Sequence, residues 1–201
     1  MPSHPVRLRV ESPAHRGRVH VLIRIILLAA VCTVGGSSVY WLLYLALPAM
    51  AALIISDKGA EAYLSENGPE IARVLRWLAA AYAYLLLLTD AFPTSSTSGP
   101  VTLEIETGGS PTIATALSRL LTSLPALLLL AVLSLAASVI WLAGAVEILV
   151  RRRVSPTVAD WLAMTLRYQL RLIAYHLSIV DRYPSVEAPI TTNFAGSDTA
   201  R

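Results

Sequence analysis

Charged residues are scarce in this 201-residue sequence: Asp, Glu, Lys and Arg together make up 14% of it, whereas 55% is hydrophobic. Soluble domains are nearer a quarter charged, so the balance indicates a lipid environment. Lysine occurs once, as Lys58, and the net charge is only +3. Because this charge is small and no basic stripe is interleaved with aromatics, we expect no nucleic acid among the partners.

Cysteine is almost absent as well: Cys32 is the single one, so no intrachain disulfide can form. The apolar run around Cys32 continues well beyond it, which predicts an uncleaved membrane anchor rather than a signal peptide. His176 stands alone among apolar residues, without a second ligand at metal-binding spacing. Phosphate-binding glycine loops and nucleophile motifs are also missing. We therefore expect no metal, no cofactor and no enzymatic activity.

Two long charge-free runs predict helices that cross a membrane. The first, Ile25–Ile55, exceeds the roughly 20 apolar residues that a bilayer requires. The second lies between Arg119 and Glu147, and three consecutive arginines follow it. Such arginines are typical of the end of a span.

Two further apolar stretches, Ile71–Ala91 and Trp161–Val180, contain arginines and leave two structures open. Their helices could span the membrane, with the arginines at the headgroups or facing the bundle interior. Alternatively, they could lie in the headgroup plane as amphipathic helices. We favour spanning, because Leu85–Leu88 and the neighbouring alanines leave no convincing polar face.

The most specific feature is a correspondence between the two halves of the chain. A shift of 91 residues superposes a series of residues around the second apolar helix of each half, and a shift of 95 superposes residues upstream. Among the pairs are Arg76 and Arg167, Tyr84 and Tyr175, Asp90 and Asp181, Phe92 and Tyr183, and upstream Arg24 and Arg119. We interpret this correspondence as an internal duplication.

The expected fold is therefore an all-α membrane protein of two tandem helical-hairpin repeats, with four transmembrane helices. Val6–Val10 and Val101–Ile105 alternate apolar and polar residues and predict a short two-stranded β ribbon outside the membrane. The expected segments are a basic N-terminal segment (1–23), a first repeat (24–93), a Ser/Thr-rich linker (94–118), a second repeat (119–184) and a disordered tail (185–201).

The stretch Arg76–Pro93 contains Arg-Trp, Ala-Tyr and Leu-Thr-Asp-x-Phe-Pro and resembles the signature of a bacterial membrane family known only as a domain of unknown function. A second form runs from Arg167 to Pro184 and retains the second arginine, Arg171. The first form has Ala80 at that position. The resemblance covers roughly residues 5–187. It implies that only the second copy is fully equipped if these arginines bind a ligand, and it implies no activity.

Six ionisable residues are candidates for binding lipid or a partner: Arg76, Arg167, Arg171, Asp90, Asp181 and Arg182. The two aspartates end their helices, where the helix dipole disfavours a negative charge. Each is expected either to form a turn with the proline that follows, with Arg182 as a counter-ion, or to mark a proton or cation site. Arg167 and Arg171 are expected either to snorkel or to pair with a lipid headgroup or a partner's carboxylate.

The leading functional hypothesis is a non-enzymatic, multi-pass protein of the cell inner (plasma) membrane that acts as an accessory or scaffold subunit. Its expected partners are membrane lipids and either another membrane protein or further copies of the chain. The alternative is a small transporter or lipid-handling protein that works as an oligomer, because duplicated bundles with internal charge are typical of transporters.

Overall fold

The computed structural model describes residues 4–11, 13, 15–93 and 99–186, with side chains throughout except at 31–41 and 43. The Ser/Thr-rich part of the expected linker, residues 94–98, lies outside the described residues. So do the expected tail from residue 187 onward, the first three residues and the side chain of Cys32.

The described part of the chain folds into six α-helices, one π-helical stretch and two strands. In chain order they are β1 (Val6–Val10), α1 (Arg18–Lys58), α2 (Ala60–Ala62), η1 (Tyr63–Asn67), α3 (Gly68–Leu85), β2 (Val101–Ile105), α4 (Ile113–Thr122), α5 (Leu124–Arg151) and α6 (Pro156–His176). The charge-free run between Arg119 and Glu147 is thus divided between two helices, which meet at Ser123.

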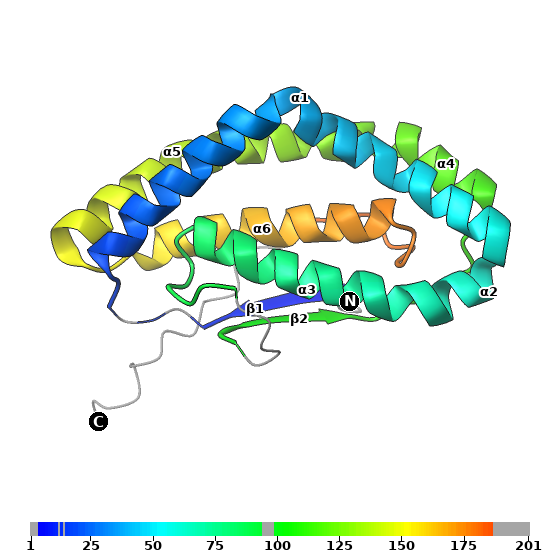
Figure 1. Cartoon of the computed structure of the whole chain (residues 1–201), viewed down its shortest axis with the longest axis horizontal. Helices are drawn as coiled ribbons and strands as arrows, with labels where there is room; N and C mark the ends of the chain where they lie inside the picture. Colours follow the sequence, from blue (N-terminus) through cyan, green and yellow to red (C-terminus); the bar gives the residue numbers. More distant parts are fainter. Residues whose placement is uncertain (1–3, 12, 14, 94–98, 187–201) are drawn as a thin grey trace.

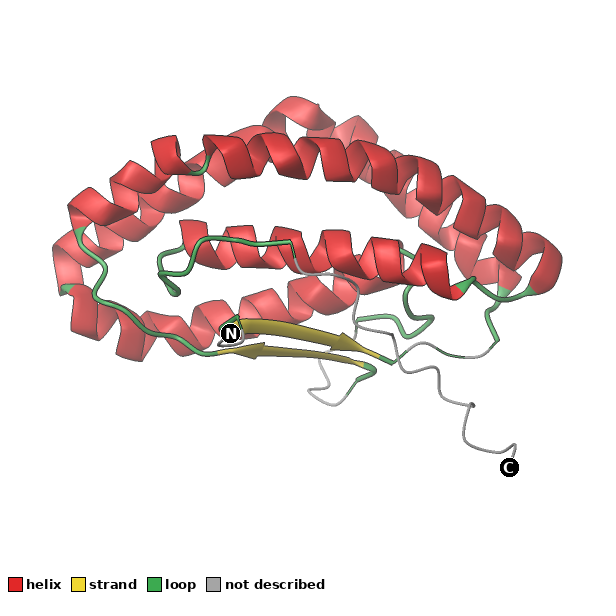
Figure 2. Ribbon diagram, turned by 180° about the vertical axis from the view of Figure 1, so that it is seen from behind, coloured by secondary structure: helices red, strands yellow, loops and turns green. Residues whose placement is uncertain are grey.

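Three layers make up the molecule (Figures 1 and 2). An outer layer contains α1, α4 and α5. Within it, α1 packs against α4 towards one end and against α5 towards the other. An inner layer contains α3 and α6. The two strands lie beyond the inner layer, so that α3 and α6 separate them from the outer helices.

The expected β ribbon is present as an antiparallel pair, with Val6 opposite Ile105 and Val10 opposite Val101. Val6, Leu8 and Val10 are buried, as the period-two alternation requires when one face of a sheet packs on a core. On the other face, Arg7 forms ion pairs with Glu104 and Glu106 of the facing segment. Both ion pairs are solvent-exposed, so the buried face supplies most of the stability of the ribbon.

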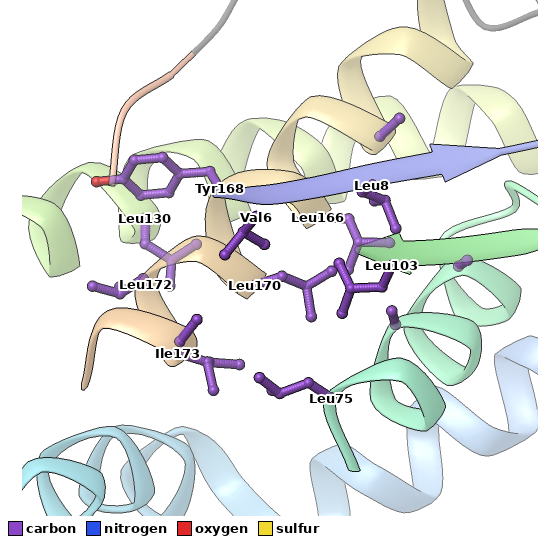
Figure 3. Packing of buried hydrophobic residues seen from close by; sticks show 14 of the residues in the cluster. Val6, Leu8, Leu75, Leu103, Leu130, Leu166, Tyr168, Leu170, Leu172 and Ile173 are labelled. Atoms are coloured by element: carbon purple, nitrogen blue, oxygen red, sulfur yellow. The ribbon is translucent and has the colours of Figure 1, made fainter. Parts of the chain in front are cut away.

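The main core lies between the sheet and the inner helices (Figure 3). Leu8 and Leu103 of the two strands approach Leu166 and Leu170 of α6, with Leu75 contributed by α3. All five side chains are at most 6% exposed. Burying a leucine contributes about 1.5–3 kcal/mol, so this cluster holds the strands onto the helices.

The four-span, two-hairpin architecture expected from the sequence is wrong. By length and composition, α5 is the one described helix that is able to cross a membrane, with a mean hydropathy of 2.6 over its best window. The stretch expected to span from Trp161 to Val180 forms α6, whose residues from Leu162 to His176 are all buried inside the protein. An apolar helix enclosed by other elements and one enclosed by lipid share the same composition. The sequence pattern therefore could not separate the two.

Candidate functional site

One buried arginine of the outer layer holds the end of α3. The guanidinium of Arg24, on α1, is completely buried and donates hydrogen bonds to the carbonyl oxygen of Thr89 (2.5 Å) and to Oδ1 of Asp90 (2.8 Å). Its central carbon lies 4.4 Å from the centre of the Tyr84 ring. Both interactions favour a positive charge in a buried position.

Two neighbours complete this arrangement. Arg16 donates to the carbonyl oxygen of Leu88 (3.0 Å) and lies 3.9 Å from Oδ1 of Asp90, while the backbone N–H of Gly17 donates to Oδ2 (2.8 Å). Burial lowers the pKa of Arg16 to about 10, although Asp90 opposes the shift and Arg24 adds to it. We call Arg16, Arg24, Tyr84, Thr89 and Asp90 the α3 cluster.

A matching arrangement holds the end of α6. Arg119, on α4, donates to the carbonyl oxygens of Tyr175 (2.5 Å) and Val180 (2.8 Å) and to Oδ1 of Asp181 (2.5 Å). Its central carbon lies 4.5 Å from the centre of the Tyr175 ring, and Tyr183 packs edge-on against that ring. We call Arg119, Tyr175, Val180, Asp181 and Tyr183 the α6 cluster.

The two clusters serve the same structural purpose. Two residues after the end of each inner helix the chain contains a left-handed residue, Leu87 with φ 62° and Ser178 with φ 55°. The carbonyls near such an end lack partners within the helix and carry the negative end of the dipole. Arg24 and Arg119 supply hydrogen bonds and positive charge at this point. They also accommodate the aspartates that the dipole disfavours.

Asp90 and Asp181 thus pair with the buried arginines Arg24 and Arg119, and Arg182, the residue after Asp181, is exposed. Arg24 and Arg119 were not among the expected site residues. Their match at a shift of 95 residues was the signal that could have identified them, because it placed both one helix upstream of the paired aspartates.

Two further expected site residues bind strand carbonyls. Arg76 of α3 donates to the carbonyl oxygen of Leu103 in β2 (3.3 Å). Arg171 of α6 donates to the carbonyl oxygens of Val6 in β1 (3.3 Å) and Ser185 (2.8 Å). Arg171 therefore faces the protein interior, which was one of the expected arrangements. Both arginines connect the sheet to the inner layer through these hydrogen bonds.

Arg167 is buried on α6, with 7% of its surface exposed, so the six expected site residues do not converge on one site. Two of them lie in the clusters, two contact the sheet, one is buried on α6 and one is at the surface: in that order, Asp90 and Asp181, Arg76 and Arg171, Arg167, and Arg182. Within the described part of the chain, no group of three or more His, Cys, Asp or Glu side chains could hold a metal ion.

His176 lies next to the α6 cluster and is completely buried. Its ring packs edge-on against Tyr44 of α1, with centroids 6.0 Å apart. Burial lowers the pKa of His176 to about 4, and Arg119 contributes in the same direction. At neutral pH the imidazole is therefore uncharged.

A family model described as Domain of unknown function (DUF4389) matches residues 114–186, in the second half of the chain. The matched range includes α5, α6 and the whole α6 cluster. The stretch Arg76–Pro93, which carries the first form of the signature, lies outside it. No curated protein and no solved structure matches the chain.

Proposed function

We propose that this chain is a non-catalytic membrane protein whose outer layer contacts lipid and which serves as an accessory or scaffold subunit for a partner complex or for lipid. One observation carries the proposal: α5 exposes a continuous apolar stripe. Its members recur at alternating steps of four and three residues, which is one face of a helix. They are Leu128, Val132, Leu135, Val139, Leu142 and Val146, each more than half exposed.

The dimensions of α5 support contact with a bilayer. Its 28 residues extend about 42 Å, and the hydrocarbon core of a bilayer is about 30 Å thick. Helix α1 adds exposed apolar side chains to the same layer, among them Leu22, Ile26 and Leu53. An exposed apolar surface of this extent is uncommon on soluble monomers.

The inner (plasma) membrane is the compartment that we propose for the chain. The multi-pass arrangement is not retained, because α5 is the one described helix that meets the length and composition of a span.

The hydrogen bonds of the buried arginines favour a scaffold role over transport. Arg24, Arg119 and Arg171 donate to carbonyls and carboxylates of the chain itself. Their hydrogen bonds are therefore committed to holding the fold together. A small transporter or lipid-handling protein that works as an oligomer is the second candidate, because buried charge beside an apolar helix layer is typical of transport pathways.

Purification of the tagged full chain from its own membranes in mild detergent, followed by native mass spectrometry, tests the proposal. A partner protein at fixed stoichiometry is the expected result. A homo-oligomer that carries only lipid would overturn the scaffold role and favour lipid handling. Recovery of the chain in the soluble fraction, without detergent, would overturn membrane association itself.

A further inference from the structure

Four exposed arginines gather where the outer layer begins and ends. Arg18 is the first residue of α1, Arg151 is the last residue of α5, and Arg152 and Arg153 follow it. Arg18 and Val150 are 132 residues apart in the chain, yet Figure 1 shows the start of α1 beside the end of α5.

Hydrogen bonds to the backbone fix this proximity. The N–H of Arg16 donates to the carbonyl oxygen of Arg152 (2.8 Å), and Nη2 of Arg18 donates to the carbonyl oxygen of Val150 (3.4 Å). The four arginines therefore form one defined surface, which we call the basic corner: Arg18, Arg151, Arg152 and Arg153.

Arg152 stands at a position where an arginine is conformationally unfavourable. It ends α5 in the left-handed region, with φ 57° and ψ 26°, which glycine or asparagine adopts more readily. A strained residue with an exposed charge points to a use for that charge outside the fold.

The surroundings of the basic corner combine charge with apolar surface. Val19 and Leu22 of α1 and Val146 and Val150 of α5 are each more than half exposed. Of the ion pairs found among the described residues, none involves the four arginines. Guanidinium groups at the edge of an exposed apolar helix face are typical of the boundary between headgroups and acyl chains.

The other end of α1 has the opposite charge. Around its last turn and the helices that follow, Asp57, Glu61, Glu66 and Glu70 are exposed, with Lys58 as the nearest base. The end of the molecule where α1 begins is therefore basic, and the end where α1 finishes is acidic. A surface of anionic lipids would attract only the first.

We propose that the basic corner binds the headgroups of anionic phospholipids and so fixes the membrane surface that this end of the outer layer contacts. The inference rests on the proposed lipid contact of the outer layer and adds its headgroup preference. Arg18 and Arg151–Arg153 supply the charge, while the neighbouring apolar side chains enter the acyl region.

The experiment is competitive lipid binding to the purified full chain in mild detergent. Phosphatidylglycerol and phosphatidylcholine with the same acyl chains are added in equal amounts, and native mass spectrometry measures how much of each is retained. A basic residue near an anionic surface contributes about fivefold in affinity. We therefore expect phosphatidylglycerol to be retained in clear excess, with the excess falling as salt is added.

Two variants of equal charge test the location. Arg151→Gln with Arg153→Gln removes two charges from the basic corner, and Arg9→Gln with Arg73→Gln removes two exposed charges from β1 and α3. The corner variant is expected to reduce the excess of phosphatidylglycerol by about tenfold or more. The control variant is expected to retain it. Circular dichroism and Tm establish that both fold.

The outcomes distinguish the two proposals. If the wild-type chain retains neither lipid, the proposed lipid contact fails and the basic corner fails with it. If it retains both lipids equally, or if the control variant loses the excess as fully as the corner variant, the lipid contact stands and the basic corner is overturned. If the corner variant does not fold, the salt dependence of the wild type is the test. An excess of phosphatidylglycerol that does not fall as salt is added would overturn the basic-corner proposal as well.

Discussion

In the α3 cluster, the Asp90 side chain is 19% exposed and faces the buried guanidiniums of Arg16 and Arg24, whereas in the α6 cluster the Asp181 side chain is 50% exposed and pairs with Arg119. The same contacts are thus made in two different dielectric surroundings. An ion pair is stronger and its disruption costlier where water is excluded, so equal geometry does not imply equal contributions to stability.

The two clusters differ in net charge too. Two arginines and one aspartate leave the α3 cluster with one excess positive charge, whereas one arginine and one aspartate balance in the α6 cluster. Among the described residues, Asp90 is the carboxylate that forms ion pairs with two buried arginines. The following predictions test how far this difference matters, from the largest expected effect to the smallest.

Replacing Asp90 by Asn should destabilise the protein most. The substitution keeps the shape of the side chain but leaves Arg16 and Arg24 buried without a counter-charge, which costs about 3–5 kcal/mol. The loss is measured as a fall in Tm in detergent. Asp57→Asn, at an exposed aspartate, is the control and should leave Tm nearly unchanged.

Replacing His176, which lies next to the α6 cluster, by Leu should remove the acid sensitivity that its lowered pKa creates. The position 91 residues earlier is Leu85, so the substitution makes the two clusters alike. The pKa of His176 is lowered in the folded protein to about 4 from an ordinary value of 6.5. Between these values the unfolded chain binds more protons, so stability is complete above about pH 6.5 and declines as the pH falls towards 4.

The size of this effect is set by the shift in pKa and amounts to at most about 3 kcal/mol. The measurement is the difference in Tm between His176→Leu and the wild type across that pH range, which cancels the titration of the carboxylates. A difference that stays constant from pH 7 to 4 would show that His176 is not the acid-sensitive group.

Asp181→Asn should cost much less than Asp90→Asn. Half of the Asp181 side chain is exposed, so water screens its pair with Arg119, and a pair of this kind contributes about 1 kcal/mol or less. Thermal unfolding of both variants under one condition makes the comparison. Equal losses of Tm would mean that the different solvent exposure of the two aspartates does not change what their ion pairs contribute to stability.

The smallest effect is expected for Tyr183→Phe. The exposed hydroxyl of Tyr183 donates to the carbonyl oxygen of Thr122 (3.2 Å), and the corresponding residue of the first half is Phe92. Loss of one exposed hydrogen bond costs about 0.5 kcal/mol. The edge-on packing against Tyr175 needs only the ring, so a large fall in Tm would contradict this account.

The sequence predicted the local elements better than their surroundings. The ribbon strands Val6–Val10 and Val101–Ile105 were located correctly, because alternation with a period of two depends only on neighbouring residues. The paired positions at shifts of 91 and 95 residues also led to the aspartates at which the two clusters form.

What the pattern could not supply was the partner of each apolar or charged face. Arg24 and Asp90 are 66 residues apart, and their pairing depends on how α1 packs on α3. The apolar periodicity of α6 was interpreted as lipid contact, whereas the strands, α3 and the outer helices surround it. Contacts between distant segments determine both features, and no local rule encodes them.

The pairing of β1 with β2 also has a consequence for biosynthesis. β1 is completed at Val10, but its partner β2 extends to Ile105, and the hydrogen bond to the carbonyl of Val6 comes from Arg171. A ribosome makes the chain from its first residue, so the N-terminal strand emerges long before anything can pair with it. Non-local pairings of this kind form slowly. The sheet is therefore among the last parts of the molecule to be completed, and until then β1 is exposed to chaperones or to other nascent chains.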